Sequence, residues 1–229
     1  TNELPRILAI ANQKGGVGKT TTTVNLAACI AELGYRVLVV DFDPQANATS
    51  ALGIDPRSVE KSMYDVILND VNLRDCILKS KWEFLSVAPS NLDLAGAEIE
   101  LVSAFNRERL LDGAISSVIS EFDFVLIDCP PSIGLLTVNA LTAASEVLVP
   151  IQCEYLALEG LGQLLSNVER VKTHLNKELH ISTIALVMFD ARTKLAGQVV
   201  EEIRSHFGER VCQQTVPRSV RLSEAPSYG

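Results

Sequence analysis

The sequence lacks three features that would each define a class of protein: an excess of basic residues, paired cysteines and a long apolar run. Its 229 residues carry a formal net charge of −8, which argues against a protein that binds nucleic acid over a generally basic surface. Net charge does not locate individual charges, so this value is compatible with a local basic patch. No apolar run reaches the roughly 18 residues of a membrane helix, and the first residues do not have the pattern of a signal peptide.

The cysteines are irregularly spaced and none forms a C-x-x-C pair. Free thiols in a reducing cytosol explain such a set better than disulfides, a zinc site or an iron–sulfur cluster. The residues concerned are Cys29, Cys76, Cys129, Cys153 and Cys212.

Short, continuous apolar runs alternate with helix-like stretches along the chain. Continuous runs are typical of strands covered on both faces, and the alternation predicts an α/β fold with a mostly parallel, twisted sheet between two helical layers. The expected strands are residues 6–12, 36–41, 84–90, 122–132, 146–152 and 182–190, and the expected helices are residues 18–33, 92–103, 107–120, 135–144, 158–175 and 195–207. Residues 55–81 are the least regular part and predict a helical insertion with loops. We expect one domain over residues 1–229, trimmed at both ends and in particular at the C-terminus.

The segment NQKGGVGKTTTT follows the first expected strand and opens the first expected helix, which is the setting of a phosphate-binding loop. Glycines let backbone N–H groups converge on phosphate oxygens, and the start of a helix adds partial positive charge. Lys19 is expected to reach the β- and γ-phosphates, and the Thr20 hydroxyl to ligate Mg²⁺. A plain glycine-rich turn does not explain this order of elements. The expected nucleotide-binding residues of the loop are Lys14, Gly15, Gly16, Val17, Gly18, Lys19, Thr20 and Thr21.

The loop departs from the usual pattern G-x-x-x-x-G-K-[ST], because Gln13 stands at the first glycine position and Lys14 follows it. The result is the deviant Walker A motif, K-G-G-x-G-K-[ST], by which the chain resembles the ParA/MinD family of P-loop NTPase-fold ATPases. The resemblance implies that the early lysine reaches across a nucleotide-sandwich homodimer to the phosphates of the other subunit, like an arginine finger. Lys19 would then serve its own nucleotide and Lys14 that of the partner, both as catalytic residues.

Acidic residues end two further expected strands. Asp41 and Asp43 lie in VVDFDPQANAT, where a common Asp-Pro turn is the alternative to a functional role at a strand end expected beside the phosphate loop. The family resemblance implies instead that Asp43 is catalytic and orients the attacking water, while Asp41 supports Mg²⁺ and the loop around it. Residues 43–49 would form switch I, with Ala46 at a position where the family often has glycine.

The run VLIDCPPS has the form of a Walker B strand, whose aspartate, Asp128, would hold Mg²⁺ through water. A helix cap is the alternative role for this side chain. The expected metal-binding residues are therefore Thr20, Asp41 and Asp128. The residues after the strand that resemble switch II, which senses the γ-phosphate, are Pro130, Pro131, Ser132 and Gly134.

Three stretches of the C-terminal third, QCEYLALEGL, MFDARTKL and VPRSVRLSEAPSYG, resemble the ParA/Soj branch, so the resemblance runs from about residue 6 to the end. It implies that Pro217 packs against adenine. It also implies that Arg192 and Arg221 lie on a dimer face that binds DNA, and we add Arg218 from the same stretch. The alternative is a solvated surface, but backbone binding needs only cations at phosphate spacing.

These features predict an ATPase that requires ATP and Mg²⁺ and turns over slowly on its own. With ATP it would form a homodimer on nonspecific double-stranded DNA, and a ParB-type partner would stimulate the hydrolysis that releases it. We expect it in the cytoplasm, associated with the nucleoid and not with a membrane. The alternative is a MinD-like ATPase that positions a protein complex on a membrane or nucleoid surface, for which a C-terminal amphipathic helix is required. An electron-transfer ATPase like the nitrogenase iron protein would need more cluster cysteines than Cys129.

Overall fold

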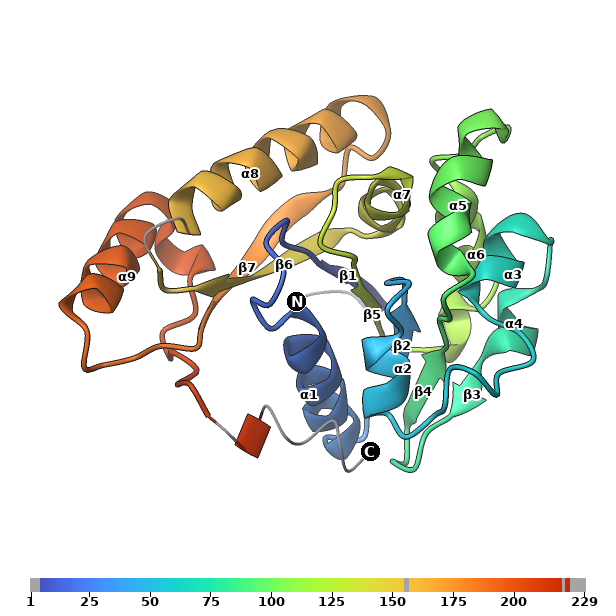
Figure 1. Ribbon diagram of the computed structural model, residues 1–229, viewed down its shortest axis with the longest axis horizontal. Coiled ribbons are helices and arrows are strands. Elements are labelled where there is room, and N and C mark those ends of the chain that lie inside the picture. The colour runs from blue at the N-terminus through green and yellow to red at the C-terminus, as the bar shows by residue number, and fades with distance from the viewer. Residues whose placement is uncertain (1–4, 155–156, 220, 223–229) are drawn as a thin grey trace.

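A sheet of seven strands, in the order β3-β4-β2-β5-β1-β6-β7, runs through the computed structural model, which describes residues 5–154, 157–219 and 221–222 (Figure 1). All neighbouring strands pair in parallel except β3 and β4, which are antiparallel. The strands are β1 (Arg6–Ile10), β2 (Val37–Asp41), β3 (Leu78–Lys79), β4 (Leu85–Ala88), β5 (Phe124–Asp128), β6 (Glu146–Gln152) and β7 (His180–Val187).

The register of the central strands brings their carboxyl ends to one edge of the sheet. β5 lies between β1 and β2, with Asp128 opposite Ile10 on one side and opposite Asp41 on the other. The loops that follow these three strands therefore start next to one another, and this is the edge at which open α/β sheets bind ligands.

Helices cover both faces of the sheet, and the side chains of each strand alternate between two cores. Ile10 and Val39 pack against α1 and α2 on one face, whereas Ala9 and Val40 belong to a larger core on the other face, which α3 to α9 cover. The helices are α1 (Lys19–Glu32), α2 (Asn47–Ala51), α3 (Met63–Leu68), α4 (Leu73–Cys76), α5 (Leu94–Glu100), α6 (Leu110–Ser116), α7 (Leu135–Ala143), α8 (Ala157–His174) and α9 (Lys194–Phe207).

The predicted α/β fold with a mostly parallel sheet is confirmed, and its differences from the prediction are local. The strand expected over residues 122–132 ends at Asp128, because Pro130 and Pro131 have no N–H group to continue the ladder. Residues 55–81 contain α3 and α4, as an insertion with helices would, and also the antiparallel edge strand β3, which the prediction lacked. The short helix α2 was not predicted either.

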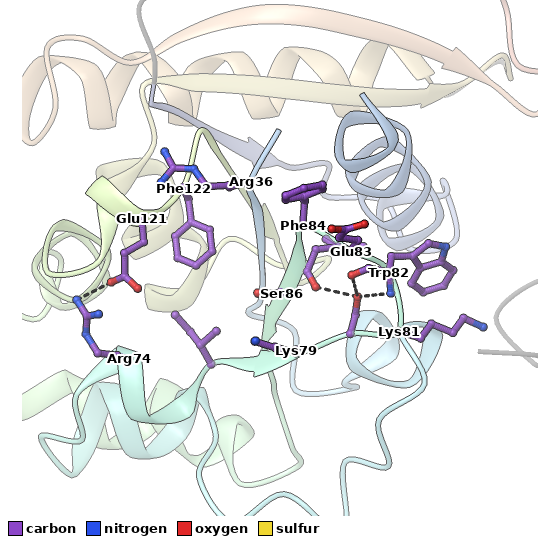
Figure 2. A pocket seen from close by; sticks show the side chains of 13 residues that line it. Arg36, Arg74, Lys79, Lys81, Trp82, Glu83, Phe84, Ser86, Glu121 and Phe122 are labelled. Carbon is purple, nitrogen blue, oxygen red and sulfur yellow. Dashed lines mark hydrogen bonds and ion pairs between the residues drawn. The ribbon is translucent and has the colours of Figure 1, made fainter. Parts of the chain in front are cut away.

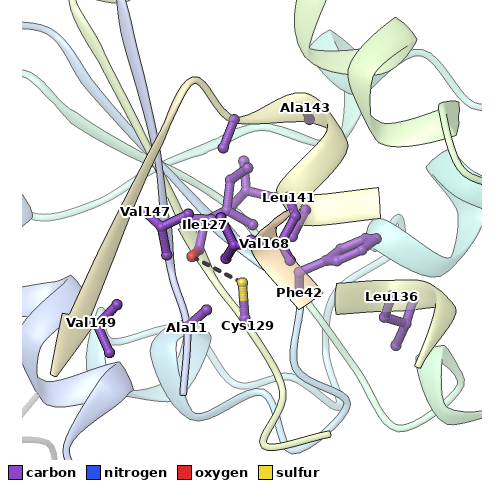
Figure 3. Packing of buried hydrophobic residues seen from close by; sticks show 14 of the residues in the cluster. Ala11, Phe42, Ile127, Cys129, Leu136, Leu141, Ala143, Val147, Val149 and Val168 are labelled. Atoms are coloured by element: carbon purple, nitrogen blue, oxygen red, sulfur yellow. Dashed lines mark hydrogen bonds between the residues drawn. The ribbon is translucent and has the colours of Figure 1, made fainter. Parts of the chain in front are cut away.

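Cys129 lies in the larger core, directly after β5 (Figure 3). Its side chain is fully buried and its thiol donates to the carbonyl of Ile127 at a sulfur–oxygen distance of 3.7 Å. Burial also raises the pKa of this thiol, so the reactive thiolate is disfavoured. A cluster shared across a dimer needs accessible thiolates, and Cys129 does not provide one.

The cysteines should react with alkylating reagents in an order set by burial. Cys29 is exposed, whereas Cys76 and Cys129 are buried and burial raises the pKa of Cys76 to about 12. We therefore expect mass spectrometry of iodoacetamide-treated native protein to show label on Cys29 and none on Cys76 or Cys129, with all labelled in denaturant. Fast labelling of Cys129 in native Cys29→Ser protein would contradict this packing.

Candidate nucleotide-binding site

The loop between β1 and α1 has the conformation that phosphate binding requires. Gly16 and Gly18 have φ angles of 73° and 76°, in the left-handed region that residues with a Cβ rarely adopt. Gly18 is the N-cap of α1, and no described side chain caps the helix, so backbone N–H groups of its first turn are available to an anion.

The two lysines of the loop lie in different surroundings. Lys19 is 7% exposed and its ammonium donates back to the carbonyl of Lys14 at 3.4 Å, so it lies across its own loop. The ammonium of Lys14 instead pairs with the carboxylate of Glu154, just beyond β6, at 2.9 Å, where both side chains are exposed. The backbone of Lys14 is fixed separately, because its N–H donates to Asn12.

The predicted Walker B aspartate is joined directly to the start of α1. The Thr20 hydroxyl donates to Asp128 at 2.7 Å, and the Thr23 hydroxyl, one turn further on, lies 3.2 Å from the other carboxylate oxygen. Asp128 is therefore not a helix cap. It is a buried carboxylate between the end of β5 and the first turn of the helix that carries the phosphate loop.

Asp41 lies beside Asp128 in the sheet but serves a different loop. One of its oxygens accepts from both the N–H and the hydroxyl of Thr49, at 2.7 and 2.6 Å. Thr49 in turn accepts from the N–H of Ser90, after β4. Asp41 thus ties the segment expected to be switch I to two strands, and the structure places it on the loop network and not in contact with Thr20.

The segment after β2 contains Ala46 and Asp43, and its conformation bears on both residues. Ala46 adopts the left-handed conformation, with φ 52° and ψ 34°, at the position where the family often has glycine. Asp43 is 7% exposed, and its carboxylate accepts from the N–H of Gln45 at 2.9 Å, which fixes the turn. The side chain of Asp43 is thereby held at the same edge of the sheet as Asp41.

Burial and nearby negative charge raise the pKa values of two carboxyl groups at this site, Asp41 and Asp128. Loss of hydration raises the pKa of Asp128 to about 8, with the charge of Asp41 as the next cause, and burial raises the pKa of Asp41 to about 6. Burial also lowers the pKa of Lys19, although the charge of Asp128 partly offsets that effect. A group of buried acids next to one buried cation is typical of a site that receives further positive charge.

A cavity of about 510 Å³ adjoins the phosphate loop on the β7 side. Pro217, the residue expected to pack against adenine, lies in its wall. Gly18 and Thr21 of the predicted loop also line it, whereas the sequence prediction missed Thr22 and Asn25 on α1 and Met188 after β7. Met188 has a φ angle of 51°, which is rare for a residue other than glycine, and such strain is often found at ligand sites.

The three arginines expected to bind DNA lie apart from the phosphate loop or at its margin. Arg192 is 87% exposed and pairs with Asp190, two residues earlier, at 2.7 Å. Arg221 is exposed, and Arg218 lines the cavity together with Pro217. The expected DNA-binding residues are thus accessible, but Arg218 is also placed to contact a nucleotide.

The described residues fit Mg²⁺ only together with nucleotide phosphates. Among them, no group of three or more His, Cys, Asp and Glu side chains is arranged to hold a metal by itself. Mg²⁺ commonly takes one or two protein oxygens and completes its shell with phosphates and water. Thr20 and Asp128 offer such oxygens, and open space lies beside Gly15 and Gly16, where a Cβ would meet no atom within 4 Å.

A second cavity, of about 640 Å³, is at the opposite edge of the sheet (Figure 2). Arg36, Phe84 and Phe122 line it, and they precede β2, β4 and β5, so they mark the amino ends of the strands. Its two arginines are already paired, Arg36 with Asp123 and Arg74 with Glu121. Lys79 and Lys81 also line it, but the cavity lies at the opposite ends of the strands from the glycine-rich loop.

Comparisons with known proteins show the family of the chain. The family model described as "AAA domain" matches residues 5–181. The chain is 54% identical to the sporulation initiation inhibitor protein Soj of Bacillus subtilis (strain 168), over 98% of this chain and 88% of that protein. It is 51% identical to the chromosome partitioning protein ParA of Myxococcus xanthus (strain DK1622), over 98% of this chain and 79% of the relative.

The chain belongs to the ParA/Soj family of P-loop ATPases. A solved structure from Mycobacterium smegmatis, named cobyrinic acid a,c-diamide synthase, has bound ATP analogue and magnesium, and superposes with a TM-score of 0.89. It is 40% identical and covers 94% of this chain and 86% of its own. No helix within the described part of the ParA/Soj chain is both long and apolar enough to cross a membrane.

The raised pKa of Asp128 predicts how stability depends on pH. Between its ordinary value of 3.8 and about 8, the folded state holds a proton that the unfolded state has released, so the free energy of unfolding falls as pH rises. One such group contributes a slope of up to about 1.4 kcal/mol per pH unit. We expect thermal unfolding with a chelator and no nucleotide to show a shallower decline from pH 5 to 8 in Asp128→Asn than in the wild type. Equal slopes would contradict the assignment.

Proposed function

We propose that the chain is a Mg²⁺-dependent ATPase whose ATP-bound form is a homodimer that binds DNA without sequence preference. The observation that carries the proposal is the separation of the two loop lysines. Lys19 is buried across its own loop, whereas Lys14 extends to the exposed carboxylate of Glu154. This is the arrangement expected if one cation serves the bound nucleotide and the other is offered to a second subunit.

The remaining roles follow from the positions of the side chains. Lys19 and the backbone N–H groups of the loop would hold the phosphates, and Thr20 and Asp128 would hold Mg²⁺. The metal ion would offset the negative charge on the phosphate oxygens. Asp43, fixed by its turn, would orient the attacking water. Because Lys14 acts on the other subunit, a single chain has an incomplete site, and intrinsic turnover is slow.

A switch needs contacts that differ between ATP and ADP. Residues 43–49 and 130–134 would provide these contacts. Each segment follows a strand that ends in an aspartate, at the carboxyl ends of the strands where the phosphate loop lies. Contact with the γ-phosphate would close the dimer, and hydrolysis would open it. A stimulating protein of the ParB type would act on this step.

DNA binding would come from summing the small basic patches of two subunits. Arg192 and Arg221 are exposed and lie outside every element of the phosphate loop. The ion pair of Arg192 with Asp190 is exposed to solvent and screened by salt, so a DNA phosphate can replace the carboxylate. The protein would then be held on the nucleoid while ATP is bound.

The test is DNA binding by the protein with ATP, with ADP and without nucleotide. We expect binding with ATP alone, and a weaker, less salt-dependent interaction for Arg192→Glu. One lost contact from each half of the dimer should make the slope of log K against log salt shallower by about two units. ATP affinity and dimerisation should not change.

Arg57→Glu is the matched control, because Arg57 is 89% exposed and pairs with Asp55, two residues earlier, just as Arg192 pairs with Asp190. Its DNA binding should equal that of the wild type. Equal DNA binding in all three nucleotide states would contradict the proposal. ATP-dependent binding to anionic lipid vesicles instead of DNA would favour the MinD-like alternative.

A further inference from the structure

A carboxylate on α5 accepts hydrogen bonds from the first turn of α7, although the two helices are far apart in the sequence. The Glu98 side chain accepts from the N–H of Leu135 at 2.8 Å and from the N–H of Leu136 at 3.2 Å. The first N–H groups of a helix have no partner within the helix, and a negative charge is favourable there. Glu98 therefore caps α7 from a neighbouring helix.

Gly134 is the N-cap of α7 and leaves the space that this carboxylate occupies. A Cβ at residue 134 would lie 2.2 Å from one oxygen of Glu98, which is far inside contact distance. The backbone of Gly134, with φ −106° and ψ −170°, is extended and open to any residue. A side chain at residue 134 would thus have to displace the Glu98 carboxylate, although the backbone of residue 134 would accept it.

The capped helix starts at the end of the loop that leaves the nucleotide site. Asp128 fixes the first end of this loop through Thr20, and Glu98 fixes the second end at Leu135. The hydroxyl of Thr137, in the first turn of α7, donates to the carbonyl of Ser132 in the loop at 2.5 Å, so the loop is also bonded to the helix. A movement of the loop that shifts Gly134 on binding or losing a γ-phosphate would therefore disturb the contact with Glu98.

We propose that Glu98 is a positioning residue for the loop of residues 130–134, and that Gly134 leaves the space in which its carboxylate reaches α7. This role rests on the proposed function, because that function assigns residues 130–134 to contact with the γ-phosphate. Glu98 touches neither the phosphate loop nor the carboxylates. It acts by holding the start of α7 where the loop can close on the nucleotide.

The test is a double-mutant cycle with Glu98→Ala, Gly134→Ala and both changes together. Either single change should lower kcat for ATP by about tenfold to a hundredfold, since a small misplacement in a catalytic assembly has effects of that size. The affinity for ADP should stay the same, because the loop is needed only for the γ-phosphate. The double variant should be no worse than either single variant, because both remove the same contact.

Glu100→Ala is the matched control, because Glu100 is on the same helix and its carboxylate accepts from the hydroxyl of Tyr64 without touching α7. It should keep the wild-type kcat. Glu98→Gln keeps an oxygen that can accept from Leu135 and should retain more activity than Glu98→Ala. Hydrogen exchange reads the contact directly: the amides of Leu135 and Leu136 should be protected in the wild type and Glu98→Gln, and should lose protection in Glu98→Ala.

Three results would overturn the proposal: independent, multiplying effects of the two single changes, an unchanged kcat in Glu98→Ala, or a fall in kcat matched by an equal loss of ADP affinity. A wild-type protein that hydrolyses no ATP would contradict the proposed function and, with it, a role of Glu98 in the reaction. In that case the amide protection would still report whether Glu98 caps α7, so the two failures can be told apart.

Discussion

The hydrogen bond from Thr20 to Asp128 joins the first turn of α1 to the end of β5, across 108 residues of sequence. It needs β1 and β5 to be neighbours in register, since β1 places the phosphate loop and β5 places the carboxylate. The Asp128 carboxylate is fully buried, and its loss of hydration makes it costly to ionise. The loop, the metal-binding residues and the segment after β5 all depend on this junction.

The same junction brings two buried carboxyl groups close together. Asp41 and Asp128 are opposite each other on adjacent strands and both are buried, so their charges repel. Each carboxylate has hydroxyl donors, from Thr49 and from Thr20 with Thr23, which reduce the penalty without removing it. A bound cation would remove more of it. Tight closure around nucleotide and metal is therefore favoured by the electrostatics of the sheet edge, and these groups gain most from a ligand.

The sequence was sufficient for the fold and for the phosphate loop, because both rest on local patterns. Continuous apolar runs marked β1, β2 and β5, and the glycines with Lys19 and Thr20 marked the loop. The pattern could not show β3, whose two residues are exposed and gain their structure from pairing with β4. It also could not show α2, which begins after the left-handed Ala46.

Contacts between segments that are distant in the sequence could not be predicted either. Nothing near Glu98 indicates that it caps a helix 37 residues later, and nothing near Lys14 indicates its pairing with Glu154. The pairing of Arg192 with Asp190 is local, at a spacing of two residues, but its exposure depends on the whole fold. The sequence could thus nominate site residues by type and position, whereas the side chains that they contact could only be seen in three dimensions.

The central claim is that Lys14 completes the site of the other subunit while Asp43 serves its own. It is tested most directly by mixing Lys14→Ala with Asp43→Ala, two variants that should both bind ATP and each hydrolyse almost none. In a mixed dimer, the site of the Lys14→Ala subunit has its own Asp43 and receives Lys14 from its partner. Equal mixing should restore about a quarter of the wild-type rate, because half of the dimers pair unlike subunits and one of their two sites is complete. No recovery, with mixed dimers shown to form, would mean that Lys14 acts within its own subunit and would contradict the account.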